Sequence, residues 1–304
     1  ALEGAPPGSG FDGRSGLESY LQYGYCPDDK MSKSVACTLE YAWADHSLSL
    51  LAEALGKTED AALFAEHAQF YRNLWNPQTR HFQPRDSQGN FVEPFRSDIQ
   101  TYMDFNQKYT RSYVEGSAEQ WRWSVPFDPK GLIELVGNNE IFVQELADYM
   151  NRTNPVLGGW NPGPYYWHGN EPFFHAAYLF NEAGRPDLTQ KWVRKILEEK
   201  YDTSYVGLDG NDDCGTMSAW YVFSAIGLYP VAGTTKYWLG SPLFDRAELK
   251  LTPTATLTII AENSPAKHYL VDNVFLNDVP LNRTWLDHNE IANGGTLRFV
   301  MRGE

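Results

Sequence analysis

The spacing of apolar residues predicts a body built mainly from helices. Over 34–55, apolar side chains recur near helical spacing, and Gly56 follows as a residue suited to end a helix. Further helices are predicted over 17–24, 58–74, 119–123, 129–136, 140–150, 172–182, 186–200 and 216–227. Several of them follow one another through short links, as expected for antiparallel helix pairs.

From about residue 232 the pattern becomes typical of strands. Short stretches alternate or are rich in β-branched and aromatic residues, at 236–240, 248–252, 256–261, 268–274 and 296–301. We therefore expect a mainly α chain in three parts. Residues 1–16 are interpreted as a linker or cut end, 17–231 as a barrel-like helical body, and 232–304 as a C-terminal β-strand appendage.

Composition and charge exclude some partners. The 304-residue chain is 42% hydrophobic, which suffices for a packed core, and its formal net charge of −14 argues against a nucleic-acid partner. No stretch of about 18 uninterrupted apolar residues is present, so no membrane span is predicted. The spacing of Cys26, Cys37 and Cys214 matches no zinc pattern.

Aromatic residues make up 14% of the chain, and many flank acidic and amide residues in predicted loops. A single aromatic residue is by default part of the core. In loops that also carry carboxylates and amides, aromatic rings can stack on sugar C–H faces while the polar groups bind hydroxyls. The combination favours a carbohydrate site.

Three segments place a carboxylate just before a predicted helix: 113–128 with Glu115, the Trp-His-Gly-Asn-Glu-Pro loop at 167–172, and 209–213 with Asp212 and Asp213. In a barrel of helices such loops converge at one mouth, and glycoside hydrolysis needs a general acid and a second carboxylate. The simpler interpretation is that these acids cap helices or balance helix dipoles, and that His168 is structural.

Five segments together resemble glycoside hydrolase family 92, in that family's order: 34–45, 113–137, 168–186, 210–231 and 240–245. The resemblance implies an (α/α)6 barrel, of which this chain corresponds to the later part with its C-terminal strands. It also implies Ca²⁺-dependent, exo-acting α-mannosidase activity that inverts the anomeric centre. An N-terminal β-sandwich and half-barrel portion of the same enzyme is the expected protein partner.

The resemblance also implies catalytic roles. Glu115 matches the family's general acid, although its motif reads EGSAEQ where the family has EGNAWQ, with changes at Ser117 and Glu119. Asp212 and Asp213 match the acidic pair from which the general base is drawn, and Asp213 is favoured.

In the 167–172 loop, Asn170 and Glu171 correspond to Ca²⁺ or sugar ligands, and Trp167 and His168 are expected near the substrate. Downstream, the family often has Ser-His-His where this chain has Phe173-Phe174-His175. We expect Phe174 and His175 to contact the substrate as well, and the change at Phe174 affects the leaving-sugar side.

The predicted reaction is single-displacement hydrolysis of terminal α-mannosides in a mannan or N-glycan, in a secreted, periplasmic or cell-surface enzyme. Two alternatives stay open. The changes at Ser117, Glu119 and Phe174 are compatible with a mannan-binding protein that has lost catalysis. A hydrolase of mannose-1-phosphoryl linkages needs little leaving-group protonation, and the retained Glu115 argues against it.

Overall fold

The computed structural model describes residues 13–153 and 163–303, which form two compact units. Within these residues, the first unit comprises 13–136 and 163–166, and the second comprises 137–153 and 167–303. Residues 1–12 of the predicted linker lie outside the described residues. The predicted boundary between 231 and 232 falls inside the second unit, which contains helices as well as the C-terminal strands.

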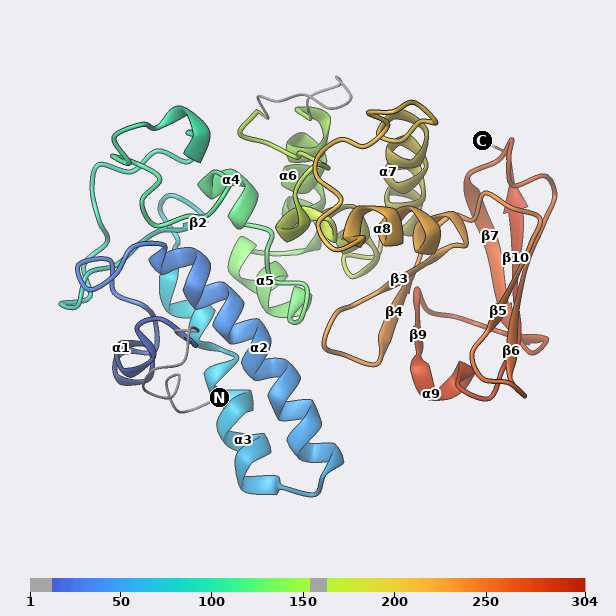
Figure 1. Ribbon diagram of the computed structural model, residues 1–304, viewed down its shortest axis with the longest axis horizontal. Helices are drawn as coiled ribbons and strands as arrows, with labels where there is room; N and C mark the ends of the chain where they lie inside the picture. Colours follow the sequence, from blue (N-terminus) through green and yellow to red (C-terminus); the bar gives the residue numbers. More distant parts are fainter. Residues whose placement is uncertain (1–12, 154–162, 304) are drawn as a thin grey trace. The chain divides into compact units, whose positions relative to one another are not determined.

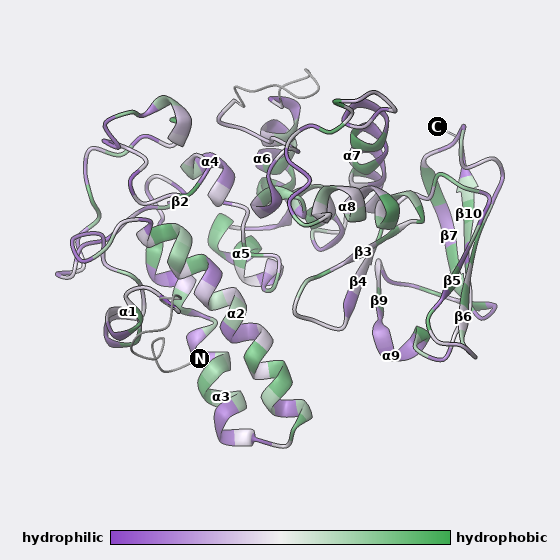
Figure 2. Cartoon of the chain, viewed as in Figure 1, coloured by the Kyte–Doolittle hydropathy of each residue, from purple (hydrophilic) through white to green (hydrophobic). Residues whose placement is uncertain are grey.

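The first unit begins with three α-helices, α1 (Leu17–Tyr23), α2 (Ser34–Ala54) and α3 (Thr58–His67). Helices α2 and α3 pack side by side, and hydrophobic and hydrophilic positions alternate along α2 (Figures 1 and 2). The predicted helix end at Gly56 is confirmed, because Gly56 has a φ of +70° and the Lys57 amide donates to the Ala52 carbonyl at 2.8 Å.

A buried carboxylate fastens α1 to α2. Asp45 is fully buried on α2, where it accepts a hydrogen bond from the Tyr20 hydroxyl at 3.0 Å and pairs with Arg14 at 2.7 Å. The same Tyr20 hydroxyl also donates to the His67 carbonyl at 3.2 Å. The predicted helix over 58–74 is interrupted after His67, because the His67 carbonyl accepts this bond from Tyr20 instead of a bond within the helix. A 3₁₀ helix, η1 (Phe70–Leu74), follows.

The rest of the first unit consists of short elements. A two-stranded antiparallel hairpin pairs β1 (Trp75–Asn76) with β2 (His81–Phe82). It is followed by η2 (Thr101–Met103), α4 (Ala118–Trp121) and α5 (Pro129–Val136). The bounds of α5 are the predicted ones.

The second unit contributes α6 (Asn139–Asn151), α7 (Pro186–Glu199) and α8 (Thr216–Ala225), all predicted within two residues at each end. The predicted helix over 172–182 is instead two 3₁₀ helices, η3 (Glu171–Phe173) and η4 (Ala176–Asn181). Every residue of η4 is buried, so this segment is packed on all sides and has no exposed face.

The C-terminal strands form two sheets. The larger has the order β5 (Arg246–Lys250), β6 (Thr256–Glu262), β10 (Gly295–Arg302), β7 (Leu270–Leu276) and β8 (Val279–Pro280). Its pairs are antiparallel except β6–β10, which is parallel with Leu297 opposite Ile259. The smaller sheet has the order β3 (Leu228–Pro230), β4 (Lys236–Leu239) and β9 (Trp285–Asp287), and a short helix α9 (His288–Ile291) follows β9.

The inward-facing residues of both sheets share one hydrophobic core. Alternate positions of β6 and β10 are buried, as the predicted period of two requires. The core includes Leu228, Leu239, Leu286, Leu257, Ile259, Leu297 and Phe299. Among residues 13–153 and 163–303, no helix combines the length and apolar character needed to cross a bilayer.

Candidate active site

Glu115 is an exposed residue in a mostly buried loop of the first unit, and its backbone has a conformation that non-glycine residues rarely adopt. Its φ is +48°, in the left-handed region, where strain of this kind is often found at functional sites. Two hydrogen bonds hold the next residue: Thr101 Oγ1 accepts from the Gly116 amide at 2.8 Å and lies 2.6 Å from the Gly116 carbonyl, to which it donates. The backbone on the C-terminal side of Glu115 is therefore fixed.

Ser117, the first departure from the family motif, begins helix α4. Its hydroxyl accepts from the Gln120 amide at 3.2 Å, and the Gln120 side chain accepts from the Ser117 amide at 2.9 Å, which completes a capping box. The Ser117 hydroxyl also donates to the Pro164 carbonyl at 2.6 Å. Serine and asparagine are both preferred N-cap residues, so this change preserves the helix start.

Glu119, the second departure, is held by polar contacts within the first turn of α4. Its carboxylate accepts from the Ser97 hydroxyl at 2.8 Å and lies 3.3 Å from His81 Nε2. Burial alone would raise the pKa of Glu119, but its contact with His81 and its hydrogen bond from Ser97 outweigh burial and lower it. A negative charge here also suits the helix N-terminus. Both departures thus have structural roles.

His168 belongs to the second unit and is completely buried. Its Nε2 lies 2.6 Å from the Tyr201 hydroxyl, which itself donates to the Met217 carbonyl at 3.0 Å. Because the hydroxyl proton is used there, we infer that His168 Nε2 carries the proton of its own bond to Tyr201. Burial, together with the positive charge of Lys200, holds the pKa of His168 well below its usual 6.5, so the ring is neutral at pH 7.

The neighbouring residues predicted to contact substrate are also packed inside the second unit. Phe174 and His175 are buried, and Trp167 is half-buried. The His168 ring packs against Phe174 and Trp220, with centroid separations of 5.0 and 4.4 Å. Contact between these four predicted residues and a sugar stays a prediction. In this structure His168, Phe174 and His175 support the loop from within.

Two of the three acidic loops come together at a pair of glycines. A Cβ atom placed on Gly210 would lie 2.3 Å from the Gly169 carbonyl oxygen, and one on Gly169 would lie 2.5 Å from the Asp209 carbonyl oxygen. Only glycine at both positions allows backbones to approach this closely. The contact brings the 167–172 loop against the 209–213 loop, while the convergence of all three acidic loops at one site stays a prediction. Glu115, on the third loop, lies in the first unit.

A buried ion pair that the sequence did not reveal fixes the base of the 209–213 loop. Lys200 Nζ lies 3.1 Å from Asp209 Oδ1, and the two side chains are 3% and 0% exposed. Between them, the chain reverses through a tight turn in which Asp202 and Gly207 are hydrogen-bonded through their backbones. The loop is therefore anchored on both sides of its acidic pair, at Asp209 and at the start of α8.

The two acids of the pair differ in their surroundings. Asp212 is half-buried, and its two carboxylate oxygens accept from the Ser218 amide at 2.8 Å and from the Ser218 hydroxyl at 2.7 Å. These bonds lower the pKa of Asp212 and make it a cap of α8. Asp213 is an exposed residue, and its φ of +31° is a backbone conformation that non-glycine residues rarely adopt.

The side-chain oxygens of the 167–172 loop are of the kind that hard cations bind. Asn170 is buried and offers an amide oxygen, and the half-buried Glu171 offers a carboxylate. Ca²⁺ prefers such oxygens but takes six to eight of them, so these two side chains supply part of a coordination shell. Among the described residues, no three His, Cys, Asp or Glu side chains gather closely enough to hold a metal by themselves. The remaining oxygens must be carbonyl, water, substrate or other protein oxygens.

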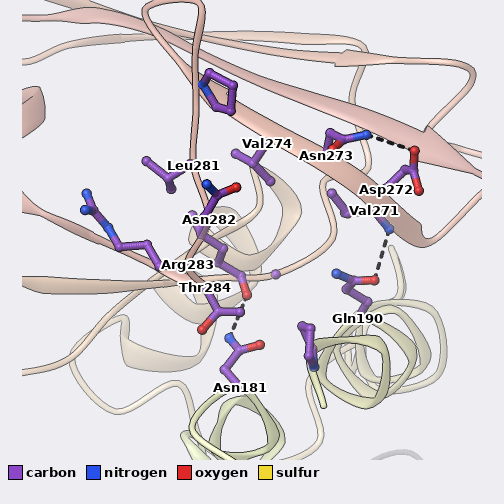
Figure 3. A pocket seen from close by; sticks show the side chains of 14 residues that line it. Asn181, Gln190, Val271, Asp272, Asn273, Val274, Leu281, Asn282, Arg283 and Thr284 are labelled. Atoms are coloured by element: carbon purple, nitrogen blue, oxygen red, sulfur yellow. Dashed lines mark hydrogen bonds between the residues drawn. The ribbon is translucent and has the colours of Figure 1, made fainter. Parts of the chain in front are cut away.

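A separate groove of about 260 Å³ lies in the second unit (Figure 3). Asn181 and Gln190 approach it from one side, and Asp272 and Asn273 of β7 approach it from the other. Two of its lining residues are hydrogen-bonded to each other, since Asn181 Nδ2 donates to the Leu239 carbonyl at 2.9 Å. Among the described residues that line it, none belongs to the three acidic loops, so the groove is distinct from the candidate active site.

Comparison with known proteins identifies the family of the chain. The model of the glycosyl hydrolase family 92 catalytic domain matches residues 3–303. A family 92 α-mannosidase from Bacteroides thetaiotaomicron, solved in complex with mannoimidazole, superposes with a TM-score of 0.86 at 35% identity, over 95% of this chain and 38% of that one. A family 92 inverting mannosidase from the same organism has a TM-score of 0.85 at 32% identity, over 98% and 41%.

A curated relative, an uncharacterized secreted glycosidase from Arthroderma benhamiae, is 28% identical over 98% of this chain and 40% of its own length. The chain thus spans about two fifths of the length of the relatives that it matches. The match nevertheless covers almost all of this chain and includes the three acidic loops. This chain therefore belongs to glycosyl hydrolase family 92.

Proposed function

We propose that this chain forms the later part of the (α/α)6 barrel of an exo-acting, inverting, Ca²⁺-dependent α-mannosidase. The observation that carries the proposal is the contact at Gly169 and Gly210, which joins the loop of Asn170 and Glu171 to the loop of Asp213. Family membership and the likeness to an α-mannosidase bound to mannoimidazole support mannose as the sugar. The likeness to an inverting mannosidase supports inversion.

In this proposal Glu115 is the general acid. Its carboxyl group is exposed on a loop that Thr101 holds in a strained conformation. In its protonated form it gives its proton to the glycosidic oxygen as the bond to the anomeric carbon breaks. The leaving sugar therefore departs as a neutral alcohol.

Asp213 is the general base. Its carboxylate accepts a proton from a water molecule, whose oxygen forms the new bond to the anomeric carbon on the face opposite the leaving group. Asp212 is less suited to this role because both of its oxygens accept hydrogen bonds from Ser218. We therefore assign Asp212 to the support of the turn and Asp213 to the chemistry.

Asn170 and Glu171 are the proposed side-chain ligands of Ca²⁺. When bound, the ion supplies a positive charge that holds sugar hydroxyls and favours one ring conformation. The buried, neutral His168 lies directly before the Gly169 contact and fixes the loop through Tyr201. These residues orient the terminal mannose.

The proposal includes the rest of the enzyme. Since the chain spans about two fifths of its relatives, we expect an N-terminal β-sandwich and half-barrel portion to complete the pocket. The substrate is a glycan with a terminal α-mannose. The curated relative is named a secreted glycosidase, which supports a location outside the cytoplasm.

The test is mannose release by the intact protein that contains this chain, measured on a panel of α-linked mannobioses. We expect release on at least one linkage, loss with EDTA, recovery with Ca²⁺, and β-mannose as the first anomer seen by NMR. Mannoside binding without release from any linkage would favour a binding protein instead. An α-mannose first product would refute inversion.

The role of Glu115 has its own test. The Glu115→Gln variant should lose about 10²- to 10⁴-fold in kcat on a mannobiose. The same variant should keep most of its activity on α-mannosyl fluoride, because fluoride leaves without protonation. Equal losses on the two substrates would mean that Glu115 is not the acid.

A further inference from the structure

The loop of Glu115 is attached to a second element of the first unit, the 3₁₀ helix η2. Gln100, directly before η2, is buried and donates through Nε2 to Gln120 Oε1 of α4 at 2.7 Å. Thr101, its first residue, exchanges hydrogen bonds with the backbone of Gly116. These contacts fix the position of η2 relative to the Glu115 loop.

The fixed element presents a tyrosine to solvent. Tyr102 is 48% exposed, although the two residues before it, Gln100 and Thr101, are held by hydrogen bonds. Burial of part of the ring and the negative charge of Glu115 both raise the pKa of the Tyr102 hydroxyl. The hydrogen bonds between Thr101 and Gly116 place Tyr102 next to the segment that carries Glu115, since Tyr102 follows Thr101 and Glu115 precedes Gly116.

We infer that Tyr102 contacts the leaving sugar and helps to determine which linkage is cleaved, an inference that rests on the proposed function. A general acid must lie within hydrogen-bond reach of the glycosidic oxygen, so a ring beside the acid flanks the bond that breaks. In an inverting displacement the base and its water are on the opposite face. The acid's neighbour therefore faces the departing sugar.

The chemistry of the ring suits this ligand. A tyrosine offers an apolar face for the C–H surface of a sugar and a hydroxyl for hydrogen bonding at its edge. Its attachment through Gln100 and Thr101 means that little side-chain and loop freedom is lost when the sugar binds. Phe105, in the same loop, is 89% exposed and has no such attachment to the Glu115 loop among the described contacts.

The experiment compares two substrates in the intact protein. We expect Tyr102→Ala to lower kcat/KM about 10-fold on the best mannobiose, because the ring's contact with the leaving sugar is lost. On α-mannosyl fluoride, which has no leaving sugar, kcat/KM should change less than about 2-fold. Tyr102→Phe should retain most of the activity on the mannobiose, and Phe105→Ala, the matched exposed control, should leave both substrates unaffected.

Two results would overturn the inference. Equal losses of Tyr102→Ala on both substrates would show that the ring supports the site or another part of the protein. An unchanged kcat/KM on every cleaved mannobiose would show that it does not meet the leaving sugar. If the unsubstituted protein releases no mannose from any mannobiose, that result refutes the proposed function itself. It is distinguishable from the two results above, which concern only the variants.

Discussion

The buried pair of Lys200 and Asp209 provides a direct test of how the 209–213 loop is held. The perturbation is Lys200→Met, which keeps much of the length and apolar character of the side chain but removes its charge. The Asp209 carboxylate, which is 0% exposed, then loses the cation that lies 3.1 Å from it. The Asp209 carboxylate cannot reach solvent unless the loop opens. The variant therefore stabilises the unfolded or locally open state relative to the native state.

The magnitude follows from burial. Removing one partner of a buried ion pair costs about 3–5 kcal/mol of unfolding free energy, whereas exposed pairs contribute about 0–1 kcal/mol. Lys195 and Glu199 form the matched control on α7, the helix that ends directly before Lys200, with 3.9 Å between their charged atoms and side chains that are 41% and 47% exposed. Lys195→Met should therefore cost less than about 1 kcal/mol.

The assay is urea unfolding of the intact protein, combined with amide hydrogen exchange of peptides that cover 200–213. We expect Lys200→Met to lower the midpoint and to speed exchange in those peptides, with a much smaller effect of Lys195→Met. Adding Asp209→Asn to Lys200→Met should recover a large part of the loss, because no buried charge remains. Equal costs for the two lysine variants would refute the reasoning.

Three further predictions concern the acids and glycines of the site. Asp213→Asn should reduce kcat on a mannobiose by about 10²-fold or more, and Asp212→Asn should reduce it far less while it speeds amide exchange at the start of α8; the reverse order in kcat would exchange their roles. Gly210→Ala should weaken both Ca²⁺ affinity and activity because its Cβ would meet the facing loop at 2.3 Å, whereas Gly163→Ala, with nothing within 4 Å, should change neither. The pKa of Glu119 is lowered from its usual 4.5, so its contribution to stability is present above that pH and is lost as the pH falls through the folded-state pKa. Glu119→Gln should therefore flatten the dependence of unfolding free energy on pH below about 4.5, and an unchanged slope in acid titrations of urea unfolding would contradict this.

The elements that the sequence predicts well are those whose pattern is local. Helix α5 starts at Pro129, a favoured first helical residue, and its apolar spacing continues to Val136, so both ends are recognisable. Strands β3, β8 and β9 have two or three residues each, too few for alternation to be detected. The division of 171–181 into two 3₁₀ helices depends on packing around a fully buried segment, which periodicity does not report.

The same distinction applies to the candidate site. The acidic loops could be found from composition and motif, since carboxylates, amides and glycines stand together in the chain. Lys200 could not, because a lysine at the end of a predicted helix normally interacts with the helix dipole at the surface. Its pairing with Asp209 and the approach of Gly169 to Gly210 are tertiary contacts that no local pattern specifies.

The order of the larger sheet has a consequence for biosynthesis. Strands β6 and β7 do not pair with each other but both pair with β10, so neither has its inner neighbour until β10 has been made. Leu257 of β6 cannot pair with Gly295 of β10 until Gly295 has been synthesised. At ordinary translation speeds the interval between the synthesis of the two residues lasts roughly 2 to 8 seconds. During that time the inner edge of β6 is open to pairing with other chains. The nascent protein thus has an unpaired inner strand edge after α6, α7 and α8 have been made and before β10 is complete.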